Sequence, residues 1–172
     1  MAIWKKLVLT TGALATCGIT GYLGARLAIN RLSPTPLSLG VTDGRLAPCP
    51  DAPNCVSTQA TDSEHRIEPI SYTGTMEETR LRLLQIIDAM PNMQLATVSG
   101  PYLHAESRSR FWGFIDDTEF YIDDEAKVIH LRAASRLGRE DFSVNRNRTI
   151  EIRDRFLALS LHDRFVKNRT PS

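Results

Sequence analysis

Polar residues that could bind or react concentrate in two segments. Residues 113–120 carry the adjacent carboxylates Asp116 and Asp117, and residues 132–148 are rich in arginine and run into a predicted helix. Free N–H groups at a helix start, with guanidinium groups nearby, favour a bound anion. We therefore predict a polar, anion-binding cluster of Asp116, Asp117, Arg132, Ser135, Arg136, Asp141, Asn145 and Arg146.

Two interpretations of this cluster stay open. In the first, the arginines pair with the carboxylates of residues 116–119 across a sheet, and Asp141 or Ser143 caps the helix. In the second, the arginines hold a phosphate, a carboxylate or a lipid head group. Asp116 and Asp117 cannot form a catalytic dyad in either case, because neighbouring residues of a strand face opposite sides of the sheet.

An enzymatic use of the same residues is the alternative. A hydrolase or transferase would use Asp116 or Asp141 as its acid or base. Arg132 or Arg136 would then stabilise the developing charge. The sequence contains neither a G-x-S-x-G turn nor an H-E-x-x-H helix, and it indicates no cofactor and no metal. A non-enzymatic binding domain that engages a membrane-proximal partner or an anionic small molecule is therefore favoured.

Cys49 and Cys55 flank the segment Pro-Asp-Ala-Pro-Asn. Two thiols this close in an exported chain are expected to pair. The prolines restrict the backbone between them, so that closing the ring costs less entropy. Two thiolates make half a zinc site, and the spacing is not C-x-x-C. We predict a structural disulfide, and a thiol-disulfide activity through the same cysteines stays an alternative.

The N-terminal segment predicts a membrane anchor. Residues 7–25 contain no charged residue and no proline, and a length of about 19 residues fits one bilayer crossing. Lys5 and Lys6 precede it, which favours a cytoplasmic N-terminus. The sequence therefore predicts a cytoplasmic segment over residues 1–6 and a single-pass signal anchor over residues 7–29. The remaining domain would face the periplasm from a bacterial inner membrane.

Two further features of the anchor leave alternatives open. The string Leu-Ala-Thr-Cys that ends at Cys17 is similar to a lipoprotein cleavage box, which would place a lipid on this cysteine. Small residues also recur every fourth position along the anchor, which would let two such helices approach closely and form a homo-oligomer. These small residues are Ala13, Cys17, Gly21 and Ala25.

Composition excludes one class of partner. The chain of 172 residues has 21 Lys and Arg against 20 Asp and Glu, but four of the cations and none of the acids precede Asp43. The remaining residues are therefore weakly acidic. A general nucleic-acid binder needs a basic face to displace counterions from phosphates, so no nucleic-acid partner is predicted.

Hydrophobic periodicity predicts the secondary structure after the anchor. Residues 40–56 are rich in Gly and Pro and predict an irregular loop, neither strand nor helix. Residues 75–78 form a capping box that begins a helix, and Pro91 ends it. Strands are predicted over residues 65–72, 93–98, 103–111, 114–122 and 127–135, and a closing amphipathic helix over residues 145–162.

This order, β-α-β-β-β-β-α with short connections, predicts an α+β fold. We expect an antiparallel sheet of about five strands with two helices packed on one face, preceded by a transmembrane helix. The other face is expected to be polar, with His104 and Arg132 facing outward. The predicted organisation is a Pro-containing linker over residues 30–39, a globular domain over residues 40–162 and a flexible tail over residues 163–172.

Four ordered segments resemble a known family. They are LAPCPDAPNCVS at residues 46–57, GFIDD at 113–117, RAASR at 132–136 and NR at 145–146. These segments resemble the family named domain of unknown function 1499, whose members carry CP-x-x-PNCVSS, GF-x-DD, RSASR-x-G and D-x-x-x-NR in this order. Thr58 and Ala133 depart from that pattern, where the family has serine. The resemblance implies a membrane-associated or exported protein of bacteria or plastids, and it implies no particular activity.

Overall fold

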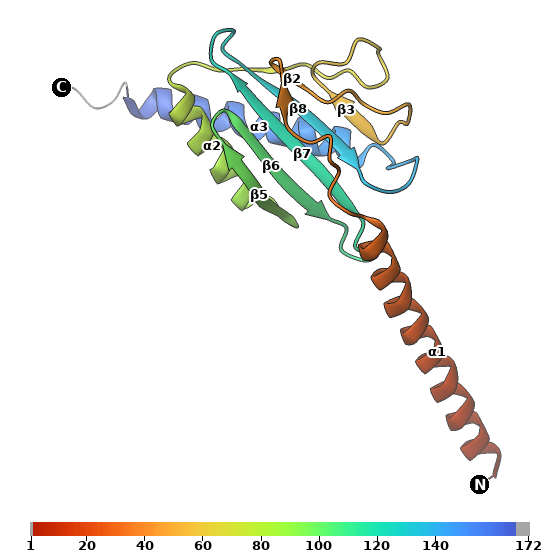
Figure 1. Ribbon diagram of the computed structural model, residues 1–172. Coiled ribbons are helices and arrows are strands. Elements are labelled where there is room, and N and C mark those ends of the chain that lie inside the picture. The colour runs from red at the N-terminus through yellow and green to blue at the C-terminus, as the bar shows by residue number, and fades with distance from the viewer. Residues whose placement is uncertain (1, 168–172) are drawn as a thin grey trace.

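The computed structural model describes the backbone of residues 2–167 and the side chains of residues 14–161. Within this part the fold is α+β, with a six-stranded antiparallel sheet and three helices (Figure 1). One helix, α1, extends away from the sheet. The helices are α1 (Ala2–Leu32), α2 (Met76–Ala89) and α3 (Val144–Lys167).

The sheet has the strand order β3-β8-β7-β6-β5, and β4 also pairs with β8. The strands of this sheet are β3 (Cys55–Ser57), β4 (Ile70–Ser71), β5 (Met93–Ser99), β6 (Tyr102–Arg108), β7 (Ile115–Asp123) and β8 (Val128–Ser135). A separate hairpin consists of β1 (Val41–Thr42) and β2 (Arg45–Leu46). The four long strands, β5 to β8, confirm the predicted strands, although β6 ends earlier than expected, at Arg108.

Helices α2 and α3 pack on one face of the sheet, as predicted, and the hydrophobic core lies between the two layers. Leu83 and Ile86 come from α2, Ile152 and Phe156 come from α3, and Phe120 comes from the centre of β7; each is at most 2% exposed. Burying one such side chain contributes about 1.5–3 kcal/mol, so this layer contact is a main source of stability.

The start of α2 has the cap that the sequence predicts. The Thr75 side chain accepts a hydrogen bond from the Glu78 backbone N–H, and the Glu78 carboxylate accepts one from the Thr75 N–H, both at 3.1 Å. The helix ends at Ala89, with Met90 as its C-cap just before Pro91. The capping box therefore sets where this helix begins.

The prediction of an irregular loop over residues 40–56 is wrong, because this region contains β1, β2 and the start of β3. β3 and β4 both pair with the outer side of β8, whose N–H and C=O groups would otherwise lack partners. The strand predicted over residues 65–72 is reduced to the two residues of β4. Pro69, which has no N–H to donate, directly precedes it.

The second face of the sheet is polar, as expected, but it is covered. Residues 33–46, here called the strap, lead from α1 across this face and end in the hairpin of β1 and β2 (Figure 1). The Gly40 N–H donates to Glu119 Oε1 at 2.8 Å. His104 and Arg132, which were expected to face outward, are only 4% and 7% exposed. Strand alternation placed both residues on the correct face and could not show that a distant segment buries it.

The predicted membrane span falls on α1. Among the described residues, no helix is both long enough and apolar enough to cross a membrane. The predicted cytoplasmic residues 1–6 and the first part of the span, residues 7–13, lie outside the described side chains. The anchor over residues 7–29 therefore stays a prediction.

Two predicted boundaries differ from those of the structure. Helix α1 continues to Leu32, so the extended linker begins at Ser33 and not within residues 30–32. Helix α3 continues to Lys167, beyond the predicted end of the domain, because the sequence offers no helix breaker there before Pro171. Residues 168–172 of the predicted tail lie outside the described part of the chain.

Candidate functional site

A pocket of about 470 Å³ opens at the end of the sheet where β6 leads into β7 and β8 leads into α3. We call it the end pocket. Two loops, residues 109–114 and residues 137–144, form its walls. Its apolar lining consists of Phe111, Trp112, Phe114, Leu137, Phe142 and Val144. Its volume is that of an ordinary small-molecule site.

The aromatic side chains of the end pocket are exposed. Phe142 is 91% exposed, Phe111 62% and Trp112 44%. A contiguous group of exposed large apolar residues marks an interaction site. Phe142 and Ser143 also have left-handed backbone, with φ of 52° and 64°. This conformation costs a residue other than glycine on the order of 1–3 kcal/mol. The fold therefore holds Phe142 outward at an energetic cost.

The inner wall of the end pocket is polar. Asp116 on β7 and Arg148 on α3 form an ion pair, with Oδ2 and Nη2 2.7 Å apart, and both side chains are mostly buried. Arg148 also donates to Asn145 Oδ1 at 2.6 Å, and the Asn145 amide donates to Ser135 Oγ at 3.1 Å. The charges of this wall are therefore paired with each other.

Asn145 fixes the loop of residues 137–144 to the rest of the domain. Its fully buried amide donates to the Asn54 carbonyl oxygen at 2.9 Å, and the Asn54 amide donates to the Gly138 carbonyl oxygen at 2.5 Å. The Asp141 carboxylate caps α3, because it accepts from the N–H groups of Ser143 and Asn145 at 3.0 and 2.9 Å. The loop of residues 137–144 is thus held by Asn54 and by the first residues of α3.

A second polar network lies on the opposite face, under the strap. Arg136 donates to Asp117 Oδ2 at 2.9 Å, to Asp117 Oδ1 at 2.7 Å and to Glu106 Oε1 at 2.5 Å. It also donates to the Ser33 carbonyl oxygen at 3.2 Å. His104 Nε2 lies 2.7 Å from Asp117 Oδ1. This network connects three strands to the start of the strap.

Opposing effects act on the Asp117 carboxyl group. Burial raises its pKa, but hydrogen bonds from Arg136 and His104 lower it more, so the pKa is held below its ordinary value. The hydrogen bonds to Asp117 likewise raise the pKa of Arg136. Asp117 is therefore ionised and firmly bound, which makes it a poor proton donor or acceptor at neutral pH.

The sheet divides the predicted cluster. The residues around the end pocket are Asp116, Ser135, Asp141 and Asn145. The residues under the strap are Asp117, Arg132 and Arg136. Arg132 pairs with Glu119, with Nη1 and Oε2 2.9 Å apart. Arg146 joins neither group, because it donates to the backbone carbonyl oxygens of Glu64 and Arg66. Arg132 and Arg136 thus contact carboxylates, as in the structural interpretation.

Several residues of the site were missed by reasoning from the sequence. Arg148 could have been found, because it lies one helical turn after Asn145 and on the same side of the helix. The aromatic residues of the segment 109–114 also gave a visible signal, since they crowd the junction between two predicted strands. Asn54 gave no signal, because its partners come from distant segments.

The acids named for enzymatic chemistry are occupied by structural partners. Asp116 is paired with Arg148, and Asp141 caps α3. Within the described residues, no group of three or more His, Cys, Asp or Glu side chains is placed to hold a metal ion. The geometry of the end pocket therefore suits binding of an apolar group better than proton transfer.

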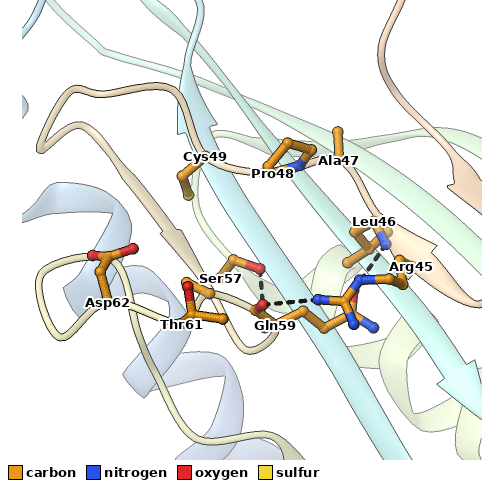
Figure 2. A pocket seen from close by; sticks show the side chains of 10 residues that line it. Arg45, Leu46, Ala47, Pro48, Cys49, Ser57, Gln59, Thr61 and Asp62 are labelled. Atoms are coloured by element: carbon orange, nitrogen blue, oxygen red, sulfur yellow. Dashed lines mark hydrogen bonds between the residues drawn. The ribbon is translucent and has the colours of Figure 1, made fainter.

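A second pocket, of about 430 Å³, lies where the strap meets the segment after β3 (Figure 2). Arg45 Nη2 donates to the Gln59 carbonyl oxygen at 3.2 Å, and the Leu46 N–H donates to Gln59 Oε1 at 2.8 Å. The Gln59 N–H in turn donates to Ser57 Oγ at 3.1 Å. Arg45, Gln59 and Ser57 of this lining are thus linked by hydrogen bonds, which join β2 to the sheet.

Cys49 and Cys55 form the predicted disulfide, with Cα atoms 5.7 Å apart. Cys55 is 1% exposed and begins β3. A buried cysteine at a strand start lacks the helix N-terminus that typically makes a thiol reactive. The bond therefore fixes β3 and the neighbouring Asn54 at the edge of the sheet. Cys17 is exposed on α1, and its lipidation stays a prediction.

The sequence matches the model of a family described as a protein of unknown function (DUF1499) over residues 45–156. The match covers more than half of the chain and includes both loops of the end pocket. It confirms the resemblance noted in the sequence. No curated protein showed significant similarity to the chain.

Proposed function

The chain belongs to the DUF1499 family, and we propose that it is a membrane-tethered binding domain that holds an anionic amphipathic molecule in the end pocket. The apolar chain of this molecule would lie on Phe114, Leu137 and the neighbouring aromatic residues, and its anionic head would meet Arg110. The observation that carries the proposal is an open apolar pocket beside a cation that has no carboxylate partner among the described residues.

The apolar wall supplies the binding energy in this proposal. Phe114, Leu137 and Val144 belong to the apolar lining, and an acyl chain that covers them removes apolar surface from water. Each 100 Å² of apolar surface covered contributes about 2.5 kcal/mol. A small polar ligand would leave this lining uncovered.

Arg110 would meet the anionic head. Three acids also line the pocket, but Asp116 is paired with Arg148 and Asp141 caps α3, so Glu140 is the lining acid that would oppose an anion.

The Arg110 side chain is exposed at the pocket, whereas Arg132 and Arg136 are already held by buried carboxylates. An anion at either of those two arginines would have to displace Glu119 or Asp117 from a buried ion pair, which is costly. The anionic head group is therefore assigned to Arg110 and not to the arginines that the sequence pointed to.

The tether belongs to the same proposal. The uncharged segment with Lys5 and Lys6 before it supports a signal anchor over residues 7–29. The disulfide between Cys49 and Cys55 supports an oxidising compartment, because such bonds are rare where thiols are kept reduced. We therefore assign the domain to the periplasmic side of a bacterial inner membrane.

Native mass spectrometry of the full chain in detergent tests the pocket. The probes are oleate and its neutral counterpart monoolein. Leu137→Trp fills the pocket, and Leu81→Trp adds the same ring at an exposed position of α2 that is 56% exposed. We expect wild type and Leu81→Trp to retain one oleate and Leu137→Trp to retain none. Arg110→Gln should lower retention of oleate more than retention of monoolein.

Two results would contradict the proposal. One is a wild-type chain that retains neither probe. The other is an oleate adduct that survives Leu137→Trp unchanged, since the probe would then bind elsewhere. Folding of each variant is checked by circular dichroism before the comparison.

A further inference from the structure

The loop of residues 109–114 is fixed against α1. The Tyr22 hydroxyl donates to the Phe111 carbonyl oxygen at 2.7 Å. The Tyr22 ring lies 5.1 Å from the Phe111 ring and 6.0 Å from the Trp112 ring, measured between centroids. The Arg108 guanidinium donates to Asn30 Oδ1 at 3.1 Å. Figure 1 shows α1 meeting the sheet at the end where β6 leads into β7.

This contact fixes the height of the loop along α1. Tyr22 belongs to the uncharged segment of residues 7–25, and Arg26 is the first charged residue after it. A helix rises about 1.5 Å per residue, so Tyr22 lies roughly 6 Å before that charge. Tyrosine and tryptophan prefer the boundary between lipid chains and water. If the segment spans the membrane, Phe111 and Trp112 lie at this boundary too.

We propose that the outer rim of the end pocket docks on the surface of the lipid bilayer that holds α1, so that the pocket opens toward the lipids. The rim consists of Phe111, Trp112 and Phe142, whose exposed rings would enter the head-group region. On α1 the apolar side chains of Leu23 and Leu27 are 57% and 55% exposed and line a pocket with Gly113 of the same loop. The inference rests on the tether in the proposed function and adds the surface that the domain presents to the membrane.

The charged residues near the rim also fit a bilayer as the partner. Arg26 and Arg31 lie on the last turns of α1, and Arg110 lies on the loop beside Phe111. The other loop adds Arg139, Glu140 and Asp141, so this group contains four cations and two acids. Each basic residue near an anionic membrane surface contributes about 1 kcal/mol of attraction. A bilayer with anionic head groups therefore matches both the apolar and the charged parts of the rim.

Fluorescence of Trp112 in lipid nanodiscs tests the docking. The full chain carries Trp4→Phe, so that Trp112 is the remaining tryptophan. The discs contain phosphatidylglycerol and phosphatidylcholine with either brominated or ordinary acyl chains, because bromine quenches tryptophan on contact. A chain with Trp4→Phe, Trp112→Phe and Leu81→Trp is the matched control, since its reporter lies on α2.

We expect brominated lipid to remove most of the Trp112 emission and to leave the Leu81→Trp reporter unchanged. Equal emission of Trp112 in both kinds of disc would overturn the inference, as would a chain that does not co-elute with the discs. Unquenched Trp112 in discs that hold two chains would assign the rim to a second copy instead. Oleate retention without quenching would support the ligand pocket and contradict the docking. Quenching without oleate retention would support the docking and contradict the ligand pocket.

Discussion

Arg136 organises the buried polar face of the sheet. It binds both oxygens of Asp117 and one oxygen of Glu106, and its side chain is only 4% exposed. The planar guanidinium fits two carboxylates at once, which a lysine cannot reproduce. Arg136 is the cation shared by both carboxylates, so its removal takes the guanidinium partner from the buried Asp117.

Arg136→Ala should lower the free energy of unfolding by about 3–5 kcal/mol, because the buried Asp117 loses its guanidinium partner and keeps only the hydrogen bond to His104. Arg155→Ala on α3 is the matched control, since its pair with Glu151 is 41% and 47% exposed. That variant should lose about 0.5 kcal/mol or less. Urea unfolding measures both. A loss below about 1 kcal/mol for Arg136→Ala would mean that the network is not structural.

The Asp117 carboxyl group should make the free energy of unfolding depend on pH in acid. Its pKa is lower in the folded protein than in the unfolded chain, so the unfolded state takes up its proton first as the pH falls. Ionised Asp117 therefore adds stability in full above about pH 4, and this stability is lost as the pH falls through the folded pKa. The gap in unfolding free energy between wild type and Asp117→Asn should be constant near neutrality and shrink in acid. A gap that does not change with pH would contradict this assignment.

At the scale of elements, the sequence predicted those that local signals specify. The capping box begins α2 at the expected residue, and the alternation of residues 114–135 marks β7 and β8. The short strands β1 to β4 could not be predicted, because they exist only through pairing with β8 or with each other. The strap was hidden for the same reason, since the residues it covers lie far away in the sequence.

The sequence predicted several polar residues of the candidate site and the separation of Asp116 from Asp117, but not all of their partners. Asp116 and Asp117 were expected on opposite faces, and the sheet separates their partners accordingly. Arg146 was expected near a carboxylate, but its guanidinium reaches two carbonyl oxygens of a loop that has no regular structure. The end pocket was not predicted, because one of its loops is held by Asn145 and Asn54 and the other by Tyr22, and these contacts join distant segments.

The disulfide between Cys49 and Cys55 should stabilise β3 and the loop of residues 137–144. Replacing Cys49 and Cys55 with alanine should cost about 2–3 kcal/mol, an upper figure for so short a ring. The residue before Cys55 is Asn54, which holds Gly138, so the loop of residues 137–144 should also become more accessible to protease. Reduction of wild type by dithiothreitol should cause the same loss, and the double variant should not respond to it. Stability unchanged by reduction would argue against this role.

The whole molecule places three features at one end. The helix α1 reaches the domain at the loop of residues 109–114, the end pocket opens between this loop and residues 137–144, and the exposed rings lie on its rim. The opposite face of the sheet is sealed by the strap and its buried charges. An anchored domain with this arrangement would present its pocket to the membrane and its closed surfaces to the periplasm.

Photocrosslinking with a palmitate that carries a diazirine on its chain tests the central claim, that the end pocket binds an anionic amphipathic molecule. The full chain is labelled in detergent, digested and mapped by mass spectrometry. We expect the label on residues 109–114 and 137–144, and we expect unlabelled oleate to compete it away. Label that is confined to α1, or that is spread evenly over the domain and unaffected by oleate, would contradict the claim.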